Sequence, residues 1–594
     1  MREVMADSSV PTSDLPDLAL GADDTDVYEE VLGRARDERW PERLFDRDPT
    51  VWSSDARVQA AIRDRLGWLD APRHFREQIP ALEGFAQGVR DAGFTSAVVM
   101  GMGGSSLAPD VLARSFRVAP GWLDVRILDS TDPENVGRVL DDIDPLQTLF
   151  IVASKSGTTT EPLAFEAEAW ARLEAALDAR GSDQRPGDFV VAITDPGRSV
   201  AAIPNHDELR EVFLNPVDVG GRYSALTYVG LVPGALLGLD LDAVLATAEA
   251  MLARCRDPEP SRNPGVSLGL AIGALARAGK DKLTILADPE IETFGAWAEQ
   301  LIAESTGKHG VGVVPVDLEP VGDPDVYGED RVFVRITLAG SAGFPEADAL
   351  VAAARGAGGP VIRIALGEPI ELAAEFVRWE VAIAIAGAVL GIDPFDQPNV
   401  EEAKERTREV LSSAGAAATV PSGAGVVEAL AADGGIALIG DAPLRLTSGD
   451  GTVVGELRRH LARRKGNAYL CLQAFIAPTP ARDASLARIR GVLRDRTGRA
   501  TTAGYGPRFL HSTGQLHKGG APIGWFLQLT ADHPNDRPIP GWPYTFGQLI
   551  HAQATGDFAA IEAHDLPILR VNLGIDPDAG LATLERALDE ALGD

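Results

Sequence analysis

The stretch Thr148–Ser156, TLFIVASKS, decides the fold, because a short aliphatic and aromatic run ends abruptly in serines and a lysine. Three similar runs surround it: Ser96–Met102 (SAVVMGM), Val125–Ser130 (VRILDS) and Phe189–Asp195 (FVVAITD). Amphipathic segments such as Glu161–Ala179 separate these runs. This alternation is typical of βαβ units around a buried parallel sheet. We therefore predict an α/β fold.

A second series of apolar runs follows, at 282–290, 312–318, 331–338 and 360–368, and a strongly apolar helix is predicted at 372–390. The chain has 594 residues, too many for one ordinary core. We expect two doubly wound parallel-sheet domains with a helical N-terminal extension. The predicted boundaries are 1–25 for a flexible tail, 26–240 for the first domain and 241–594 for the second, whose C-terminal segment returns to the active site. Further strand-like runs occur at 468–476 and 524–530, and the Ala/Gly-rich residues 412–450 suggest a linker with short helices.

The acidic composition excludes several classes of partner. With 87 acidic and 55 basic residues the net charge is -32, which repels nucleic acid and anionic membranes. The N-terminus lacks a basic segment followed by an apolar core, so no secretory signal is predicted. The longest apolar run, Val381–Leu390, is shorter than the roughly 20 residues that a membrane span requires. The two cysteines, Cys255 and Cys471, indicate no disulfide framework. We expect a cytoplasmic protein.

Two of the strand-like runs in the first series end in unusual loops. The first loop, Val98–Asp110 (VVMGMGGSSLAPD), combines glycines with Ser105 and Ser106 at an expected helix start. Alone it is equally compatible with a dinucleotide loop or a tight turn. The second, Ala153–Pro162 (ASKSGTTTEP), offers several hydroxyls and Lys155 to a phosphoryl group, although ordinary helix capping also uses Ser and Thr. Because ligands bind at the carboxyl ends of parallel strands, the two loops together favour phosphate binding.

Other phosphate-binding classes fit less well. The second loop lacks the Gly-Lys-Ser/Thr ending of a P-loop, which disfavours a kinase or a nucleotide hydrolase. A dehydrogenase would use an acidic residue such as Asp129 at the end of the second strand, but it has no need for the second loop.

At this point the chain resembles the glucose-6-phosphate isomerase family, of the SIS (sugar-isomerase) fold, and in particular the isomerase portion of bacterial transaldolase–glucose-6-phosphate isomerase fusions. The matching motifs occur in order as VMGMGGSSLAP, SKSGTTTEP, VGGRYSALTYVG, EQLIAESTGK and DPFDQPNVEEAK, and RATTAGYGPRFLHSTGQLHKGG resembles the C-terminus of the fusions. The chain before Gly101 is too short for the roughly 250-residue barrel of a transaldolase half. The resemblance implies that both domains are of SIS type.

The resemblance also implies the site residues. Substrate contacts fall on Gly104, Ser105, Ser154, Lys155, Ser156, Thr159, Glu161, Gln300 and Gln397, and catalytic roles on Glu304, Lys404 and Arg222, to which we add His517 as the preferred histidine. Ser156 and Gly157 stand where the family usually has Thr and an aromatic residue. In this scheme Glu304 is the base that moves a proton between adjacent carbons. Arg222 stabilises the enediolate, while His517 and Lys404 open the sugar ring. A structural alternative pairs Glu304 with Lys308 one helical turn later.

The histidine is the point where this chain departs from the family pattern. Between Glu304 and Lys404 the sequence contains only His309, which lacks a matching context. His511 and His517 follow later, in LHSTGQLHKGGAP. We prefer His517 because the glycines after it would let a substrate approach closely, although either imidazole could be structural.

The resemblance therefore implies a glucose-6-phosphate isomerase of glycolysis and gluconeogenesis that acts through a cis-enediol(ate), with no cofactor and no metal. Two kinds of alternative stay open. The first is another isomerase, either a bifunctional glucose/mannose phosphate isomerase or an isomerase of another hexose phosphate. The second is a non-catalytic SIS module that senses sugar phosphates. The joint presence of Glu304, Arg222 and Lys404 argues against a sensor. The expected partner is a small sugar phosphate, and the resemblance implies a homodimer.

Overall fold

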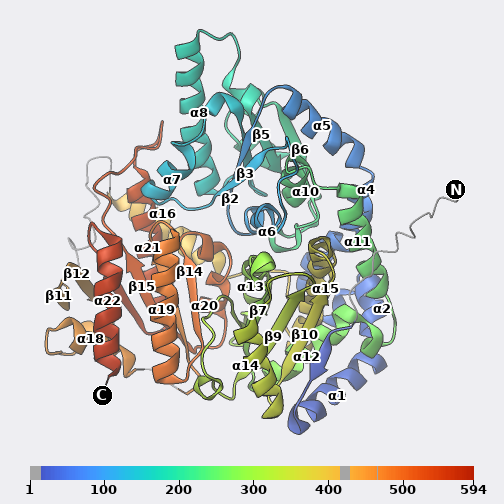
Figure 1. Ribbon diagram of the computed structural model, residues 1–594, viewed down its shortest axis with the longest axis vertical. Coiled ribbons are helices and arrows are strands. Elements are labelled where there is room, and N and C mark those ends of the chain that lie inside the picture. The colour runs from blue at the N-terminus through green and yellow to red at the C-terminus, as the bar shows by residue number, and fades with distance from the viewer. Residues whose placement is uncertain (1–14, 415–428, 464–465, 594) are drawn as a thin grey trace.

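The computed structural model describes residues 15–414, 429–463 and 466–593. These residues form three sheets in which parallel pairs predominate, and in Figure 1 the three sheets lie around a common centre. The predicted α/β class is confirmed. The third sheet is a feature that the sequence interpretation had not separated from the second domain.

The first sheet carries the two glycine- and hydroxyl-rich loops. Its order is β3-β2-β4-β5-β6 and every pair is parallel. The strands are β2 (Ser96–Gly101), β3 (Asp124–Leu128), β4 (Thr148–Ala153), β5 (Val190–Thr194) and β6 (Glu211–Leu214). The helices of this phosphate-loop unit, residues 96–236, are α6 (Leu107–Ser115), α7 (Pro133–Leu140), α8 (Thr160–Arg180), α9 (Arg198–Ala202) and α10 (Tyr228–Leu236). All six residues of β2 and of β4 are buried, as expected of strands covered on both faces.

The chain order reverses between β2 and β4, since β3 lies on one side of β2 and β4 on the other. A crevice forms outside the carboxyl ends of the strands at such a point. The loops after β2 and β4 therefore meet there.

The second sheet has the order β1-β10-β9-β7-β8. Its strands are β7 (Lys282–Ala287), β8 (Val314–Val316), β9 (Arg331–Leu338) and β10 (Val361–Leu366), with β1 (Asp17–Ala19) added antiparallel to β10. Its helices are α11 (Leu241–Arg254), α12 (Pro264–Arg277), α13 (Phe294–Thr306), α14 (Pro345–Gly356) and α15 (Leu372–Leu390). The helix predicted at 372–390 is α15, which is buried along nearly its whole length and packs on α11, α12 and α13. We call residues 241–390 the second unit.

The helical N-terminal extension contains α1 (Ala22–Asp37), α2 (Trp40–Phe45), α3 (Ala56–Arg63), α4 (Ala71–Arg76) and α5 (Ile79–Asp91). The helix α1 packs on α12, and α5 packs on α10. The flexible tail predicted for 1–25 is wrong from Asp17 onward, because β1 pairs with β10 and α1 begins shortly after β1. Residues 1–14 lie outside the described residues.

The third sheet, of the C-terminal unit (residues 429–593), has the order β11-β12-β16-β15-β13-β14. Parallel pairing joins β13 (Tyr469–Phe475), β14 (Thr501–Tyr505), β15 (Gly524–Thr530) and β16 (Ile568–Asn572), and the hairpin β11 (Ala431–Asp433) and β12 (Ile436–Gly440) adds on antiparallel. Its helices are α17 (Ala442–Arg445), α18 (Val453–Leu461), α19 (Pro480–Thr497), α20 (Gly514–Gly519), α21 (Phe546–Ala563) and α22 (Pro577–Leu592). Helix α16 (Val400–Ala414), which precedes this unit, packs on α21.

The predicted linker with short helices at 412–450 is wrong for residues 431–440, which form the strands β11 and β12, whereas the short helix α17 agrees with it. Residues 415–428 of that prediction lie outside the described residues. The strand-like runs at 468–476 and 524–530 are confirmed as β13 and β15.

The C-terminal unit is packed firmly against the second unit. One apolar cluster joins Ala303, Val314 and Val316 of the second unit to Leu516, Phe526 and other residues of the C-terminal unit. The carboxylate of Glu319 accepts hydrogen bonds from the backbone N–H and the hydroxyl of Thr501, both at 2.7 Å. Shared apolar burial of this kind fixes the orientation of the two sheets.

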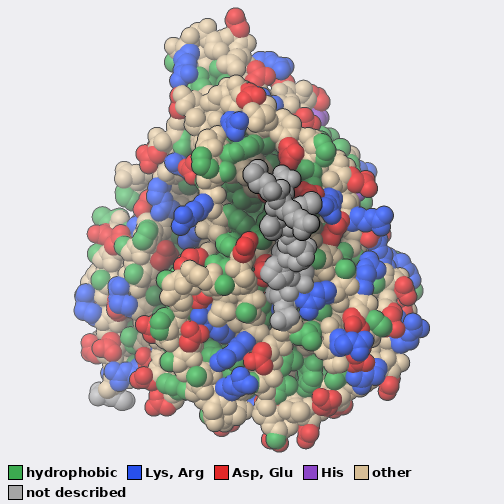
Figure 2. All heavy atoms as spheres, turned by 45° about the vertical axis from the view of Figure 1, so that its right-hand side comes forward, with side chains coloured by type: hydrophobic (Ala, Val, Ile, Leu, Met, Phe, Trp, Pro, Cys, Tyr) green, Lys and Arg blue, Asp and Glu red, His purple; other side chains and the backbone are tan. Residues whose placement is uncertain are grey.

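On the face shown in Figure 2, Lys and Arg lie interspersed with Asp and Glu. Within the described ranges, no helix is long and apolar enough to cross a membrane.

Candidate active site

A pocket of about 640 Å³ lies where the three units meet. The phosphate-loop unit contributes the loops after β2 and β4, the second unit contributes α13, and the C-terminal unit contributes the segment 510–511 and helix α21. Helix α16 supplies a further wall. The volume falls in the range of small-molecule sites.

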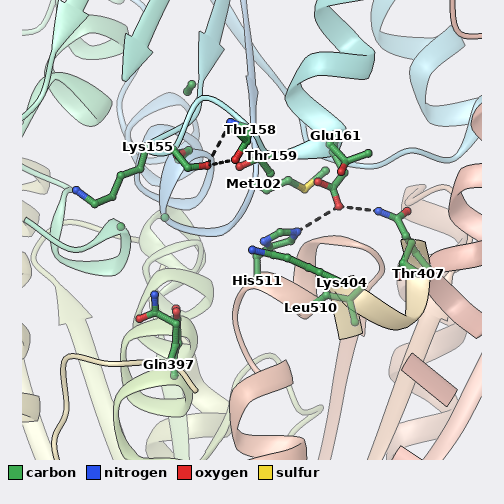
Figure 3. Close-up of a pocket in the computed structure, with 18 of the residues that line it drawn as sticks. Met102, Lys155, Thr158, Thr159, Glu161, Gln397, Lys404, Thr407, Leu510 and His511 are labelled. Atoms are coloured by element: carbon green, nitrogen blue, oxygen red, sulfur yellow. Dashed lines mark hydrogen bonds and ion pairs between the residues drawn. The ribbon is translucent and has the colours of Figure 1, made fainter. Parts of the chain in front are cut away.

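The hydroxyls of the second loop are paired with one another. The hydroxyl of Ser154 donates to Thr159 at 3.0 Å, and the hydroxyls of Ser156 and Thr158 lie 3.0 Å apart. Helix α8 begins directly afterwards, with Thr159 as its N-cap residue, so the first amides and the positive end of the helix dipole face the loop. Figure 3 shows Thr158 and Thr159 side by side at the pocket wall. The arrangement suits an oxyanion such as a phosphoryl group.

Lys155 lies differently from its neighbours. Its Nζ forms an ion pair of 2.6 Å with Asp195 and donates to the carbonyl of Val217 at 3.1 Å. In Figure 3 the side chain extends away from the hydroxyls of Thr158 and Thr159. Lys155 lines the pocket as a charge at its rim.

The glycines of the first loop allow neighbouring segments to approach closely. A Cβ at Gly103, whose φ is +52°, would lie 2.4 Å from the carbonyl oxygen of His511. A Cβ at Gly104 would lie 2.2 Å from the carbonyl oxygen of Gly221. Since real Cβ atoms do not come so near, only glycine permits the loop to contact both segments. Ser105, the next residue, lines the pocket.

Arg222 is held rigidly at the pocket. Its side chain is 2% exposed and forms an ion pair of 3.1 Å with Glu304. Its Nε donates to the hydroxyl of Ser305 at 2.8 Å, its Nη1 donates to Gln397 at 3.1 Å, and its Nη2 donates to the carbonyls of Pro394 and Asp396. The charge is thus fixed before substrate arrives, as electrostatic stabilisation requires.

Glu304 lies on α13 one turn after Gln300. The amide nitrogen of Gln300 donates to Glu304 at 3.1 Å, while the amide oxygen of Gln300 is buried and has no hydrogen-bond partner among the described residues. The predicted structural alternative, a Glu304–Lys308 pair, is wrong. Lys308 instead forms an ion pair with Asp396 at 2.7 Å and donates to the carbonyl of Asp393. It thereby supports the segment that carries Gln397.

A carboxylate and an imidazole from different units meet on another wall. The Nε2 of His511 lies 3.2 Å from Glu161, and Gln553 on α21 donates to the same oxygen at 2.6 Å. Burial alone would raise the pKa of the Glu161 carboxyl, but the charge and hydrogen bond of His511 bring that pKa below its usual value. Figure 3 shows the His511 ring and the tip of Lys404 close together at this wall. The group can hold and move a proton.

The preference for His517 is not supported by the structure. His517 is 4% exposed, does not line the pocket, and packs between Phe509 and Phe526 under the third sheet. Burial, with the nearby Lys518 charge, lowers its pKa well below the usual value, so the ring stays neutral near neutral pH. His511, the alternative in the same motif, lines the pocket.

The family profile described as Phosphoglucose isomerase matches residues 51–329. The "Glucose-6-phosphate isomerase" of Rubrobacter xylanophilus is 32% identical over 407 residues, which cover 59% of this chain and 90% of the relative. This chain belongs to the glucose-6-phosphate isomerase family. A second relative of the same name, from Symbiobacterium thermophilum, is 31% identical. The alignment covers 59% of this chain and 87% of that relative.

Two solved structures share the fold of this chain. A hypothetical protein of Thermus thermophilus is 25% identical with a TM-score of 0.56, and the alignment covers 67% of this chain and all of that protein. A glucose-6-phosphate isomerase of Chlamydia trachomatis, 21% identical with a TM-score of 0.51, shares the fold over 65% of this chain and 86% of its own. The profile match ends at residue 329, so the C-terminal unit of this isomerase lies outside it.

The pocket gathers most of the residues expected of the isomerase from its motifs. Eleven predicted residues line it: Gly104, Ser105, Lys155, Ser156, Thr159, Glu161, Arg222, Gln300, Glu304, Gln397 and Lys404. Ser154 lies behind Thr159 and is 2% exposed, so it supports the loop from below. His517 lies outside the pocket.

Several lining residues were not predicted: Asp195, Ser199, Thr407, Arg408, Leu411, Leu510, Tyr544, Leu549 and Gln553. Those on α16 could have been found, because Thr407, Arg408 and Leu411 follow Lys404 at helical spacing on one face. Gln553 has no such signal, since it reaches the pocket only through the docking of α21.

No cluster of three or more His, Cys, Asp or Glu side chains suited to a metal ion occurs in the part of the chain that the structure describes.

Proposed function

We propose that this isomerase interconverts glucose 6-phosphate and fructose 6-phosphate through a cis-enediol(ate), with Glu304 as the base. One observation carries the proposal. Glu304, paired with the buried cation of Arg222, shares a pocket with the hydroxyl-rich loop and with the Glu161–His511 pair. A phosphate anchor, a base beside a fixed cation and a second proton-transfer group are the parts that an aldose–ketose isomerisation uses.

Substrate binding begins at the loops after β2 and β4. Ser105, Ser156 and Thr159 donate to the phosphoryl oxygens together with the first amides of α8. Their contacts fix one end of the sugar, which places the other end near α13.

Ring opening follows on the wall formed by the C-terminal unit. His511 transfers a proton between the ring oxygen and the anomeric hydroxyl, and Lys404 supplies positive charge beside it. Glu161 orients the imidazole, because it faces Nε2 and is itself held by Gln553. His511 thus takes the role that the sequence interpretation gave to His517.

Proton transfer takes place at Glu304. Its carboxylate removes the proton from C2 of open-chain glucose 6-phosphate and returns it to C1, while the hydroxyl proton moves from O2 to O1. Arg222 faces the negative charge that develops on the enediolate, and its contacts with the protein keep it from moving away. No group outside the substrate is oxidised or reduced.

The deciding experiment compares turnover of glucose 6-phosphate, fructose 6-phosphate and mannose 6-phosphate in coupled assays. Exchange between the first two alone supports the proposal, and added turnover of the mannose ester favours the bifunctional alternative. No turnover of any of them would overturn it.

The variant Glu304→Gln distinguishes an isomerase from a sensor of sugar phosphates. An isomerase loses about 10³-fold in kcat or more when its base is removed, yet still binds substrate. A sensor would keep its response to the sugar phosphate in this variant.

We also propose that the enzyme is cytoplasmic and that it is a homodimer, as the resemblance implies. Its net charge of -32 supports the further proposal that it binds neither nucleic acid nor anionic membranes. Light scattering on the purified protein distinguishes a mass of 62.8 kDa from about twice that value.

A further inference from the structure

Arg508 joins the C-terminal unit to the phosphate-loop unit beside the pocket. Its Nη2 lies 3.0 Å from Asp110, and its Nε contacts Asp129. Both carboxylates are 13% exposed, so the bridge lies at a closed interface. Asp110 belongs to α6, the helix that follows the first glycine loop, and Asp129 follows β3.

The other end of the same segment carries the imidazole. A single 3-10 turn, Arg508–His511, places Arg508 at its first position and His511 at its last. The carbonyl of His511 accepts a hydrogen bond of 2.7 Å from Gln300 and rests against Gly103. The turn is therefore held by the phosphate-loop unit at its first residue, and by the second unit and the close approach of Gly103 at its last.

From this geometry we propose that Arg508 is a positioning residue, whose bridge to Asp110 and Asp129 holds the turn so that His511 meets Glu161 at the pocket. The inference rests on the proposed function, because His511 is the group it positions. Arg508 does not line the pocket, so its effect on the reaction passes through the turn.

The electrostatics of the bridge call for an arginine. Burial raises the pKa of the Asp129 carboxyl, and the nearby Asp110 raises it further, while Arg508 opposes both effects. Without the guanidinium, the two acidic side chains lose the cation that they share, and the turn loses its contact with both of them. A lysine keeps the charge but cannot contact both carboxylates with the same planar geometry.

A matched control exists at the same interface. Arg482 of α19 forms an ion pair of 2.8 Å with Glu134 of α7, so it also joins the C-terminal unit to the phosphate-loop unit. Arg482 does not line the pocket, and its helix carries no pocket residue. Comparing variants of the two arginines distinguishes an effect on the position of His511 from a general weakening of the contact between the two units.

The test measures two reactions of glucose 6-phosphate in wild type, Arg508→Gln, Arg508→Lys and Arg482→Gln. Anomerisation, followed by exchange NMR, requires only ring opening and closure. Isomerisation requires proton transfer between C1 and C2 as well. We expect Arg508→Gln to lose about 10²-fold in both rates, the cost of a small misplacement, with KM nearly unchanged. We expect Arg508→Lys to lose less, and Arg482→Gln to lose thermal stability with both rates kept.

The inference would be overturned if Arg508→Gln and Arg482→Gln lowered the two reaction rates equally. It would also be overturned if the folded Arg508 variants kept the wild-type rate of anomerisation. If Arg508→Gln does not fold, Arg508→Lys carries the same comparison. A wild-type enzyme without isomerisation would instead contradict the proposed function, so the two failures are distinguishable.

Discussion

The phosphate-loop unit and the C-terminal unit both bring polar side chains to the pocket, but they hold them in different ways. In the first, the partners are close in sequence: Ser154 supports Thr159, and Ser156 pairs with Thr158. In the second, His511 and Gln553 find their partner, Glu161, more than 300 residues away along the chain. In the proposed mechanism, phosphate binding is thus a local property of one loop, whereas ring opening depends on how two units dock.

The largest effect expected from this contrast is on His511. Replacing it with alanine should lower both isomerisation and anomerisation by about 10²- to 10⁴-fold, since a proton-transfer group is lost. His517→Ala should lower the melting temperature, because it leaves a cavity in a packed interior, while the folded protein keeps its kcat. Steady-state rates and thermal denaturation of both variants check this. Loss of kcat in the His517 variant alone would reverse the assignment.

Mixing experiments test whether each chain completes its own site. In the structure a single chain supplies Glu304 and His511 to one pocket. Co-expressed Glu304→Gln and His511→Ala chains should therefore show no more isomerase activity than the two variants measured separately. Recovery of activity in purified mixed oligomers would mean that one chain supplies the imidazole to another.

A medium effect is expected at the loop. Thr159→Val removes a donor to a charged phosphoryl group, worth about 1.5–3 kcal/mol, and should raise KM about 10- to 100-fold with little change in kcat. Ser154→Ala, one contact further from the ligand, should raise KM less. An unchanged inhibition constant for a sugar phosphate in Thr159→Val would contradict the local account of binding.

The smallest effect concerns the other interface of the C-terminal unit. Burial and the nearby Asp317 raise the pKa of Glu299 to about 8, against opposing charges from Arg490 and Arg508. The folded protein therefore binds a proton there that the unfolded chain releases above its usual pKa of about 4.5. Stability consequently falls as the pH rises from about 4.5 to about 8. Glu299→Gln should make the stability depend less on pH in this range. At pH 8.5 its melting temperature should exceed that of wild type by a few degrees, which corresponds to about 1 kcal/mol in the free energy of unfolding. An unaltered pH profile of the melting temperature would contradict the shift.

Prediction from sequence placed pocket residues correctly where several of them lie close together in one sequence motif. The loops after β2 and β4, and the residues Arg222, Glu304 and Gln397, lie in compact motifs, so each was placed from its neighbours. The roles of these residues stay predictions until they are tested. The parallel sheets followed from the apolar runs that form β2, β4 and β7.

The histidine shows where such reasoning stops. His511 and His517 stand six residues apart in one polar, glycine-rich segment, and nothing local tells which one faces the pocket. The turn at Arg508 and the cover of α20 over the third sheet decide it, and both are tertiary features. The third sheet was not separated from the second domain because β13 and β15 alone stand out as strand-like runs, whereas β11 has three residues and β12, β14 and β16 have five each.

The packing of α16 on α21 has a consequence for how the reaction is divided in space. His564, directly after α21, contacts Glu402 of α16 at 2.9 Å, so the helix that carries Lys404 is anchored to the C-terminal unit. The groups proposed to open the ring, Lys404 and His511, thus rest on α16 and the C-terminal unit, whereas Glu304, the proposed base, lies on α13. The hydrogen bond from Gln300 of α13 to the carbonyl of His511 joins the two groups directly. In the proposed mechanism, the ring and the carbon-bound proton are therefore handled by different parts of the chain that meet at this contact.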